Sequence, residues 1–186
     1  TICHVRMLAQ LTHDINMREK CCRHLRKYAV KNLILFGIFN VFFGLTIGFG
    51  LGVYSLPILT AETGLDDAAI AARQPTIERL GKFYRNLEGS DSLHWGEGTI
   101  MVGDGSVWLD GSVSPGPDYR LYFAPIFVET EESFLAIKSQ SVEVGSIKAF
   151  TNFTLQLPDG VNVDGFPAVV IWCEAFSQFI TAAELS

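Results

Sequence analysis

Charged residues are missing from a long stretch of this 186-residue chain, because no Asp, Glu, Lys or Arg occurs from Asn32 to Ala61. Charge is also scarce overall, at 18% of the residues, which is low for a soluble protein of this size. No serine has the G-x-S-x-G context of a hydrolase nucleophile. These absences argue against a soluble enzyme, although they leave an enzymatic activity open.

The charge that is present is divided between the two ends of the chain. Residues 1–31, the head, contain seven basic and two acidic residues, for a net charge of +5. Residues 62–186 contain eighteen acidic and seven basic residues, for a net charge of −11. This acidic body argues against a nucleic-acid partner, since binding to phosphates requires basic side chains that displace counterions.

Residues 33–59 form an apolar run of 27 residues in which Asn40 is the only strongly polar interior side chain. At about 1.5 Å per residue, such a helix spans roughly 40 Å, more than the hydrocarbon core of about 30 Å. We therefore expect a transmembrane helix over residues 32–60 that ends near Pro57. The run exceeds the apolar region of a signal peptide, usually about 7–15 residues, so we expect a retained anchor.

The basic residues of the head predict the orientation of this helix. Six of them lie within about 15 residues of its start, namely Arg18, Lys20, Arg23, Arg26, Lys27 and Lys31, whereas the first basic residue after it is Arg73. Basic flanks stay in the cytoplasm. We expect a single-pass protein of the inner or plasma membrane, with a cytoplasmic N-terminus and a periplasmic or extracellular C-terminal domain.

Gly44, Gly48 and Gly52 recur every four residues along the predicted transmembrane helix. Small residues at this spacing allow two helices to approach closely. The expected partners are therefore the lipid bilayer and either other transmembrane subunits or a second copy of the chain. The sequence does not choose between the last two.

The four cysteines are separated by the predicted membrane. Cys3, Cys21 and Cys22 lie in the head, and Cys173 is alone on the other side, so no disulfide is expected within the exported domain. A zinc site in the head is disfavoured because Cys21 and Cys22 are adjacent. Lipidated cysteines and idle reduced thiols remain as alternatives for the head.

Residues 61–80, the connector, are expected to lie near the membrane surface and to contain a short helix. An acidic start and a basic end predict a helix over residues 66–73, with Thr63 as its cap and Pro75 as its stop. Residues 76–80 could add one more helical turn.

Short β segments follow, over residues 81–186. The predicted strands are residues 99–102, 106–109, 119–128, 143–150, 152–157 and 168–173. Gly103-Asp104-Gly105 predicts a hairpin turn, and the last strand is apolar on both faces, which is typical of a central strand. The spacing of apolar residues from Phe176 onward favours a terminal helix, with a strand as the alternative. With no intervening helices, the fold class is mainly β: one transmembrane helix followed by a small antiparallel β-sandwich or barrel.

An ordered series of residues in this region resembles a known family. The series comprises Gly81-Lys82-Phe83, His94, Gly98, Leu109, Gly116-Pro117-Asp118, Tyr122, Val144-Gly145, Lys148, Leu157-Pro158, Ile171-Trp172-Cys173 and Phe176. It is similar to the extracellular electron-transfer domain often found beside DOMON modules, the DM-thirteen family, over roughly residues 80–185.

The resemblance implies an all-β module whose characteristic cysteine is Cys173, acting as a bare redox thiol or holding a prosthetic group such as haem. His94 is the only histidine outside the head, so it is the candidate partner of Cys173 in holding a cofactor, and Met101 is a weaker one. No C-x-x-C-H haem attachment sequence occurs. An ordinary buried cysteine at the end of a core strand is the alternative interpretation of Cys173.

Two functions follow from these observations. The first is an accessory component of an electron-transfer membrane assembly, or supercomplex, that exposes a β-domain with Cys173 as its candidate redox thiol. The second is a purely structural subunit of a respiratory or photosynthetic membrane complex, without redox chemistry of its own. Neither requires an enzymatic activity.

Overall fold

The computed structural model describes residues 2–186, with side chains from Arg26 onward. The chain divides into two compact units, one ending at Leu51 and the other covering Gly52–Ser186. The predictions made for Cys3, Cys21 and Cys22 concern side chains outside the described ones.

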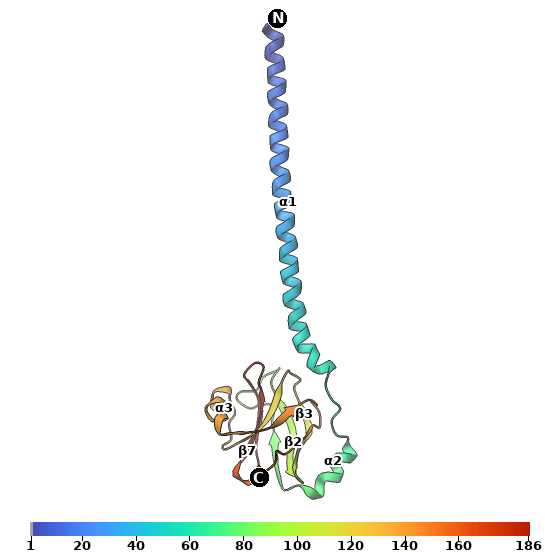
Figure 1. The fold of residues 1–186 in the computed structure, drawn as a ribbon, viewed down its shortest axis with the longest axis vertical. Coiled ribbons are helices and arrows are strands. Elements are labelled where there is room, and N and C mark those ends of the chain that lie inside the picture. Colours follow the sequence, from blue (N-terminus) through green and yellow to red (C-terminus); the bar gives the residue numbers. More distant parts are fainter. Residues whose placement is uncertain (1) are drawn as a thin grey trace. The chain divides into compact units, whose positions relative to one another are not determined.

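The first element is α1 (Ile2–Leu59), a helix of 58 residues that Figure 1 shows as one continuous ribbon. Its segment Arg26–Leu59 is long and apolar enough to cross a membrane, by length and composition. The apolar side chains of this segment are exposed, with Phe36 at 67% and Phe42 at 68%. A hydrocarbon environment is one that would cover such a surface. The helix also includes residues 2–31 of the head, which was not predicted.

Polar side chains inside the apolar segment bond to the helix itself. The Asn40 side-chain amide donates to the carbonyl of Phe36 at 2.8 Å, and the Thr46 hydroxyl donates to the carbonyl of Phe42 at 2.9 Å. In a medium without water, a polar group must find such a partner within the protein. Both residues are therefore compatible with a position in hydrocarbon.

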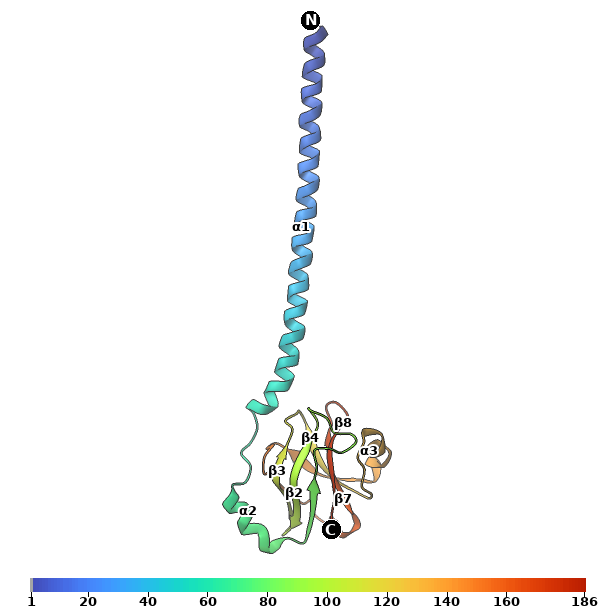
Figure 2. The same ribbon diagram turned by 180° about the vertical axis from the view of Figure 1, so that it is seen from behind.

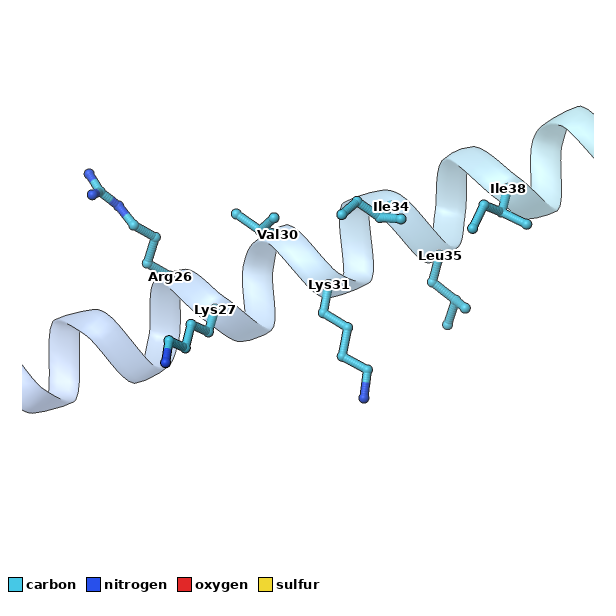
Figure 3. A pocket seen from close by; sticks show the side chains of 7 residues that line it. All are labelled: Arg26, Lys27, Val30, Lys31, Ile34, Leu35 and Ile38. Atoms are coloured by element: carbon cyan, nitrogen blue, oxygen red, sulfur yellow. The ribbon is translucent and has the colours of Figure 1, made fainter.

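Figure 3 shows where α1 changes from basic to apolar side chains. Arg26, Lys27 and Lys31 precede Ile34, Leu35 and Ile38 on a shallow groove along the helix. The groove is formed by residues of α1 alone. Long basic side chains beside apolar ones are typical of the border between lipid headgroups and hydrocarbon.

The second unit contains two antiparallel sheets of four strands, in the orders β1-β2-β3-β6 and β5-β4-β7-β8, which confirms the predicted fold class. The strands are β1 (Arg79–Phe83), β2 (Gly96–Gly103), β3 (Ser106–Val113), β4 (Tyr119–Ala124), β5 (Val142–Ile147), β6 (Thr154–Gln156), β7 (Ala168–Cys173) and β8 (Gln178–Glu184). A bridge between Gly81 and Leu185 links β1 to β8 and joins the sheets at one edge. The main core lies between them.

The predicted hairpin and the predicted central strand are both confirmed. The turn between β2 and β3 is formed by Asp104 and Gly105, with φ values of 47° and 66°, the pair of positive values that a two-residue hairpin turn favours. Strand β7 lies between β4 and β8, and all six of its residues are buried.

Strand β7 is buried on its outer face because a helix covers that face. Helix α3 (Glu131–Ile137) places Phe134 against Trp172, with ring centroids 5.1 Å apart, and Figure 2 shows α3 beside the sheet of β7 and β8. The prediction of a domain without intervening helices was wrong. Helix α3 has only seven residues, too few for a clear periodicity of apolar residues. Its capping residues, Thr130 and Ser133, are also common in turns.

The predicted terminal helix was also wrong, because residues 178–184 form β8. Five consecutive residues of this strand are buried, and in such a run periodicity alone does not separate a strand from a helix. Other strands are shorter than predicted. Strand β4 ends before Pro125, β5 ends at Ile147, and β6 starts only after Asn152, whose φ of 50° interrupts an extended backbone.

The connector packs on the sheet of β1, β2, β3 and β6. Its backbone N–H groups at Leu65 and Glu78 donate to the carbonyls of Asn152 at 2.8 Å and Val102 at 2.9 Å. Helix α2 (Asp67–Arg73) lies beside this sheet in Figures 1 and 2, with Arg73 5.6 Å from the Trp108 ring.

Three details of the connector differ from the prediction. The cap of α2 is Asp66, which accepts from the Ala69 N–H at 2.7 Å, and Thr63 has no such role. A side chain directly before the first helical residue reaches these N–H groups, and one three residues earlier does not. Pro75 lies inside a short 3₁₀ turn (Gln74–Thr76), and the chain then enters β1 instead of a further helical turn.

Candidate functional site

Cys173 is the last residue of β7, directly opposite Tyr119 of β4. Its thiol faces the main core and is 2% exposed. The sulfur lies 3.0 Å from the carbonyl oxygen of Pro117, to which the S–H donates. The residue that the sequence singled out is therefore buried, reduced and hydrogen-bonded.

Two tight turns hold this end of β7. Asp118 precedes β4 with a φ of 50°, and Ser177 precedes β8 with a φ of 51°, both in the left-handed region that few residues other than glycine adopt. The N–H of Glu174 donates to the carbonyl of Asp118 at 3.0 Å and ties the turns together. Gly116 completes the arrangement, because a Cβ there would overlap the Tyr119 hydroxyl.

The surroundings of the sulfur favour the protonated thiol. Burial raises the pKa of Cys173, and hydrogen bonds from the backbone N–H groups of Phe176 and Ala175 offset only part of that rise. Desolvation acts on the charged thiolate, while the N–H groups stabilise negative charge on the same atom. Because burial outweighs these hydrogen bonds, Cys173 is a protonated thiol at neutral pH.

His94 lies in the loop before β2 and is held by Asp91. Its Nδ1 is 3.0 Å from the Asp91 carboxylate, and its side chain is 28% exposed. The hydrogen bond from His94 is the main reason why the pKa of Asp91 lies below its usual value. No hydrogen bond or ion pair joins His94 to Cys173 among the described side chains.

Met101 is also separate from Cys173. It is buried on β2, paired across the strands with Trp108, and lies outside the core cluster that contains Cys173. Among residues 26–186, no group of three His, Cys, Asp or Glu side chains could hold a metal ion.

The arrangement around Cys173 does not fit a haem. An iron bound to the sulfur would need an open coordination face. The sulfur instead lies among core side chains with only 2% of the residue exposed, and its near neighbours are the Pro117 carbonyl and two backbone N–H groups. The bare thiol is the form that these residues accommodate.

A polar network lies on the outer face of the same sheet, next to Cys173 in the chain. The Tyr122 hydroxyl donates to the Glu174 carboxylate, and Lys138 lies 2.7 Å from that carboxylate. Arg120 joins Glu143 at 2.7 Å and Asp118 at 2.8 Å. This network was not predicted from the sequence, although Tyr122 was part of the family resemblance and Glu174 directly follows Cys173.

The predicted packing residues Gly44, Gly48 and Gly52 lie on α1. Apart from neighbouring helix backbone, no described atom lies within 4 Å of the positions that their Cβ atoms would take. The role of these glycines in packing stays a prediction.

Comparison with known proteins yields one match. A sequence profile of the family described as Electron transfer DM13 matches residues 86–185, which is just over half of the chain and includes β2 to β8 with Cys173. No curated protein and no solved structure matches the chain.

Proposed function

The chain belongs to the Electron transfer DM13 family, and from this premise we propose that it is an electron-transfer module anchored in a membrane by α1, with Cys173 as its redox group. The observation that carries the proposal is the family match, because it contains the only cysteine after residue 22. The apolar surface of residues 26–59 supports the anchor.

The bare thiol is the proposed reactive form. One-electron oxidation of Cys173 passes one electron to an acceptor in the membrane assembly and one proton to solvent, leaving a sulfur-centred radical. The hydrogen bond from the thiol to the Pro117 carbonyl supports this role, since it polarises the S–H bond that breaks. Burial keeps the oxidised sulfur away from other thiols.

The proposed topology follows from the charge distribution. Arg26, Lys27 and Lys31 directly precede the apolar residues of α1, whereas the domain that follows is acidic. Basic flanks stay in the cytoplasm, so the β-domain would lie in the periplasm or outside the cell. There it would act as an accessory component of a larger electron-transfer assembly, with Gly44, Gly48 and Gly52 available for contact with another helix.

The test uses two variants of the full chain in membranes. Cys173→Ser removes the proposed redox group, and a variant in which Cys3, Cys21 and Cys22 are all serine is the matched control. We expect electron transfer through the assembly to be lost in Cys173→Ser and retained in the control. Unchanged electron transfer in Cys173→Ser would overturn the redox role.

A structural subunit without redox chemistry is the second candidate, and the burial of Cys173 favours it. In that case, Cys173→Ser would leave electron transfer unchanged, and deletion of residues 81–186 would reduce the amount of assembled complex. A potentiometric titration of the variant in which Cys3, Cys21 and Cys22 are serine separates the two candidates by the number of electron equivalents per chain. The redox role requires one equivalent that is lost when Cys173→Ser is added to this variant.

A further inference from the structure

Tyr122 lies on the outer face of β4 with its hydroxyl between two carboxylates. The residue is 6% exposed, and its hydroxyl donates to Glu174, while an oxygen of Glu143 lies 3.4 Å away. The aromatic rings of Phe134 and Trp172 belong to the same buried cluster. A phenol enclosed by protein is thus in contact with a carboxylate that can accept its proton.

The carboxylate is held in its ionised form. Partial burial by itself would raise the pKa of Glu174, but hydrogen bonds from Lys138 and Tyr122 outweigh it, so the pKa lies below the usual value. Burial first, and then the hydrogen bond to Glu174, raise the pKa of Tyr122. At neutral pH the pair therefore consists of a neutral phenol and a carboxylate.

The other tyrosines of the β-domain lack this arrangement. Within residues 79–186, Tyr119 is hydrogen-bonded to Ser114, and Tyr84 is half exposed with Lys82 5.4 Å from its ring. Neither donates to a carboxylate among the hydrogen bonds of these residues. Tyr122 alone in this domain combines burial with an acceptor for its proton.

Trp172 provides an internal contrast. Its indole N–H is buried and has no hydrogen-bond partner among the described residues. Oxidation of Trp172 would leave its indole proton without an acceptor. Oxidation of Tyr122 makes its phenol a strong acid, and the Glu174 carboxylate is in contact with it to accept the proton. In this cluster Tyr122 is the side chain from which an electron can be removed without creating an uncompensated buried charge.

We propose that Tyr122 is a redox-active residue of this domain, with Glu174 as the acceptor of its phenolic proton. A one-electron oxidant, such as an oxidised metal centre of a partner, takes one electron from Tyr122. The phenolic O–H bond breaks and the proton joins the Glu174 carboxylate, giving a neutral tyrosyl radical and a neutral carboxylic acid. When a donor returns one electron, the proton returns from Glu174 to the phenolic oxygen.

This inference rests on the proposed function and deepens it, because it places a second redox group on the opposite face of the sheet from Cys173. Glu174 follows Cys173 in the chain, and its N–H bonds to the turn whose Pro117 carbonyl accepts the thiol hydrogen. The two groups lie on opposite faces of one sheet, Cys173 in the main core and Tyr122 in the cluster beneath α3. Cys173 has no carboxylate among its hydrogen-bond partners, so the two groups differ in how they can lose a proton.

The test oxidises the detergent-solubilised full chain with flash-generated ruthenium(III) tris-bipyridine and detects radicals by electron paramagnetic resonance. We expect a neutral tyrosyl radical that is absent in Tyr122→Phe and present in the matched control Tyr84→Phe. Glu174→Gln keeps a hydrogen-bond acceptor but removes the base, so radical formation should slow on the order of 100-fold, the lower end for a positioned proton acceptor. The same step in the unmodified chain should slow in deuterated water, which tests it without any substitution.

A radical that persists in Tyr122→Phe, or a rate that neither Glu174→Gln nor deuterated water changes, would overturn the inference. The role of Cys173 is judged separately, because Cys173→Ser retains both Tyr122 and Glu174 and should still form the radical at Tyr122. If electron transfer in membranes depends on Cys173 and no Tyr122 radical forms, the proposed function stands and this inference falls.

Discussion

The apolar residues of α1 and those of the β-domain have the same chemistry and opposite environments. Phe42 of α1 is 68% exposed, whereas Phe123 of β4 is fully buried between the two sheets. The core side chains of the β-domain cover one another, whereas the apolar side chains of α1 do not pack on one another in this way. Stability of the β-domain should therefore depend on contacts within it, and the helix should depend on its surroundings.

The largest effect is expected where helix α3 covers the sheet of β4 and β7. Phe134→Ala removes the ring that packs on Trp172 and Tyr122, which should lower the free energy of unfolding by about 3–5 kcal/mol. Phe42→Ala is the matched control in α1 and should leave unfolding of the β-domain unchanged. Chemical denaturation in detergent, followed by tryptophan fluorescence, measures both. Equal losses in the two variants would contradict the comparison.

A smaller effect is expected at Arg79, whose side chain holds the segment before β7 and the residue after β8. The Arg79 guanidinium donates to the carbonyls of Val163 and Phe166 at 2.9 and 2.8 Å, and to that of Leu185 at 2.8 Å. Arg79→Met should lower the free energy of unfolding by about 1.5–3 kcal/mol, the range for hydrogen bonds to a charged group. Lys148→Met, at an exposed ion pair with Glu62, should change it little. If Arg79→Met leaves the free energy of unfolding unchanged, β8 is held in place without this residue.

The smallest effect is the pH dependence that Glu174 adds. The pKa of this carboxyl is below its unfolded value of about 4.3, so its contribution is present above about pH 4.3 and is lost as the pH falls through the lower folded-state value. The difference in unfolding free energy between the unmodified chain and Glu174→Gln should shrink between about pH 6 and pH 3. Asp91 and Glu97 also have a lowered pKa, but they remain in both proteins and cancel. A constant difference across this range would mean that the pKa of Glu174 is the same in the folded and the unfolded protein.

Much of the fold could be predicted because its signals are local. Three features could be predicted from residues that are neighbours in the chain. They are the apolar run of α1, the turn at Asp104 and Gly105, and strand β7, which is apolar on both faces. Helix α3 and strand β8 could not be predicted, since seven residues carry little periodicity and a fully buried strand resembles a buried helix.

The candidate site was predictable only in part. Cys173 was identified through its position in a family series, but its thiol environment depends on the Pro117 carbonyl, 56 residues away in the chain. The interpretation of His94 as a partner of Cys173 rested on His94 being the only histidine outside the head. The structure places His94 against Asp91, three residues away.

The sequence by itself determined the separation of charge, the apolar segment and the β-rich composition, because each depends on which residues are near one another along the chain. Only the tertiary structure decided which groups can exchange protons. Tyr122 and Glu174 are 52 residues apart and meet because β4 and β7 pair in one register, in which Tyr119 lies opposite Cys173. A shift of one residue would turn every side chain of β7 to the other face of the sheet and separate the phenol from its carboxylate.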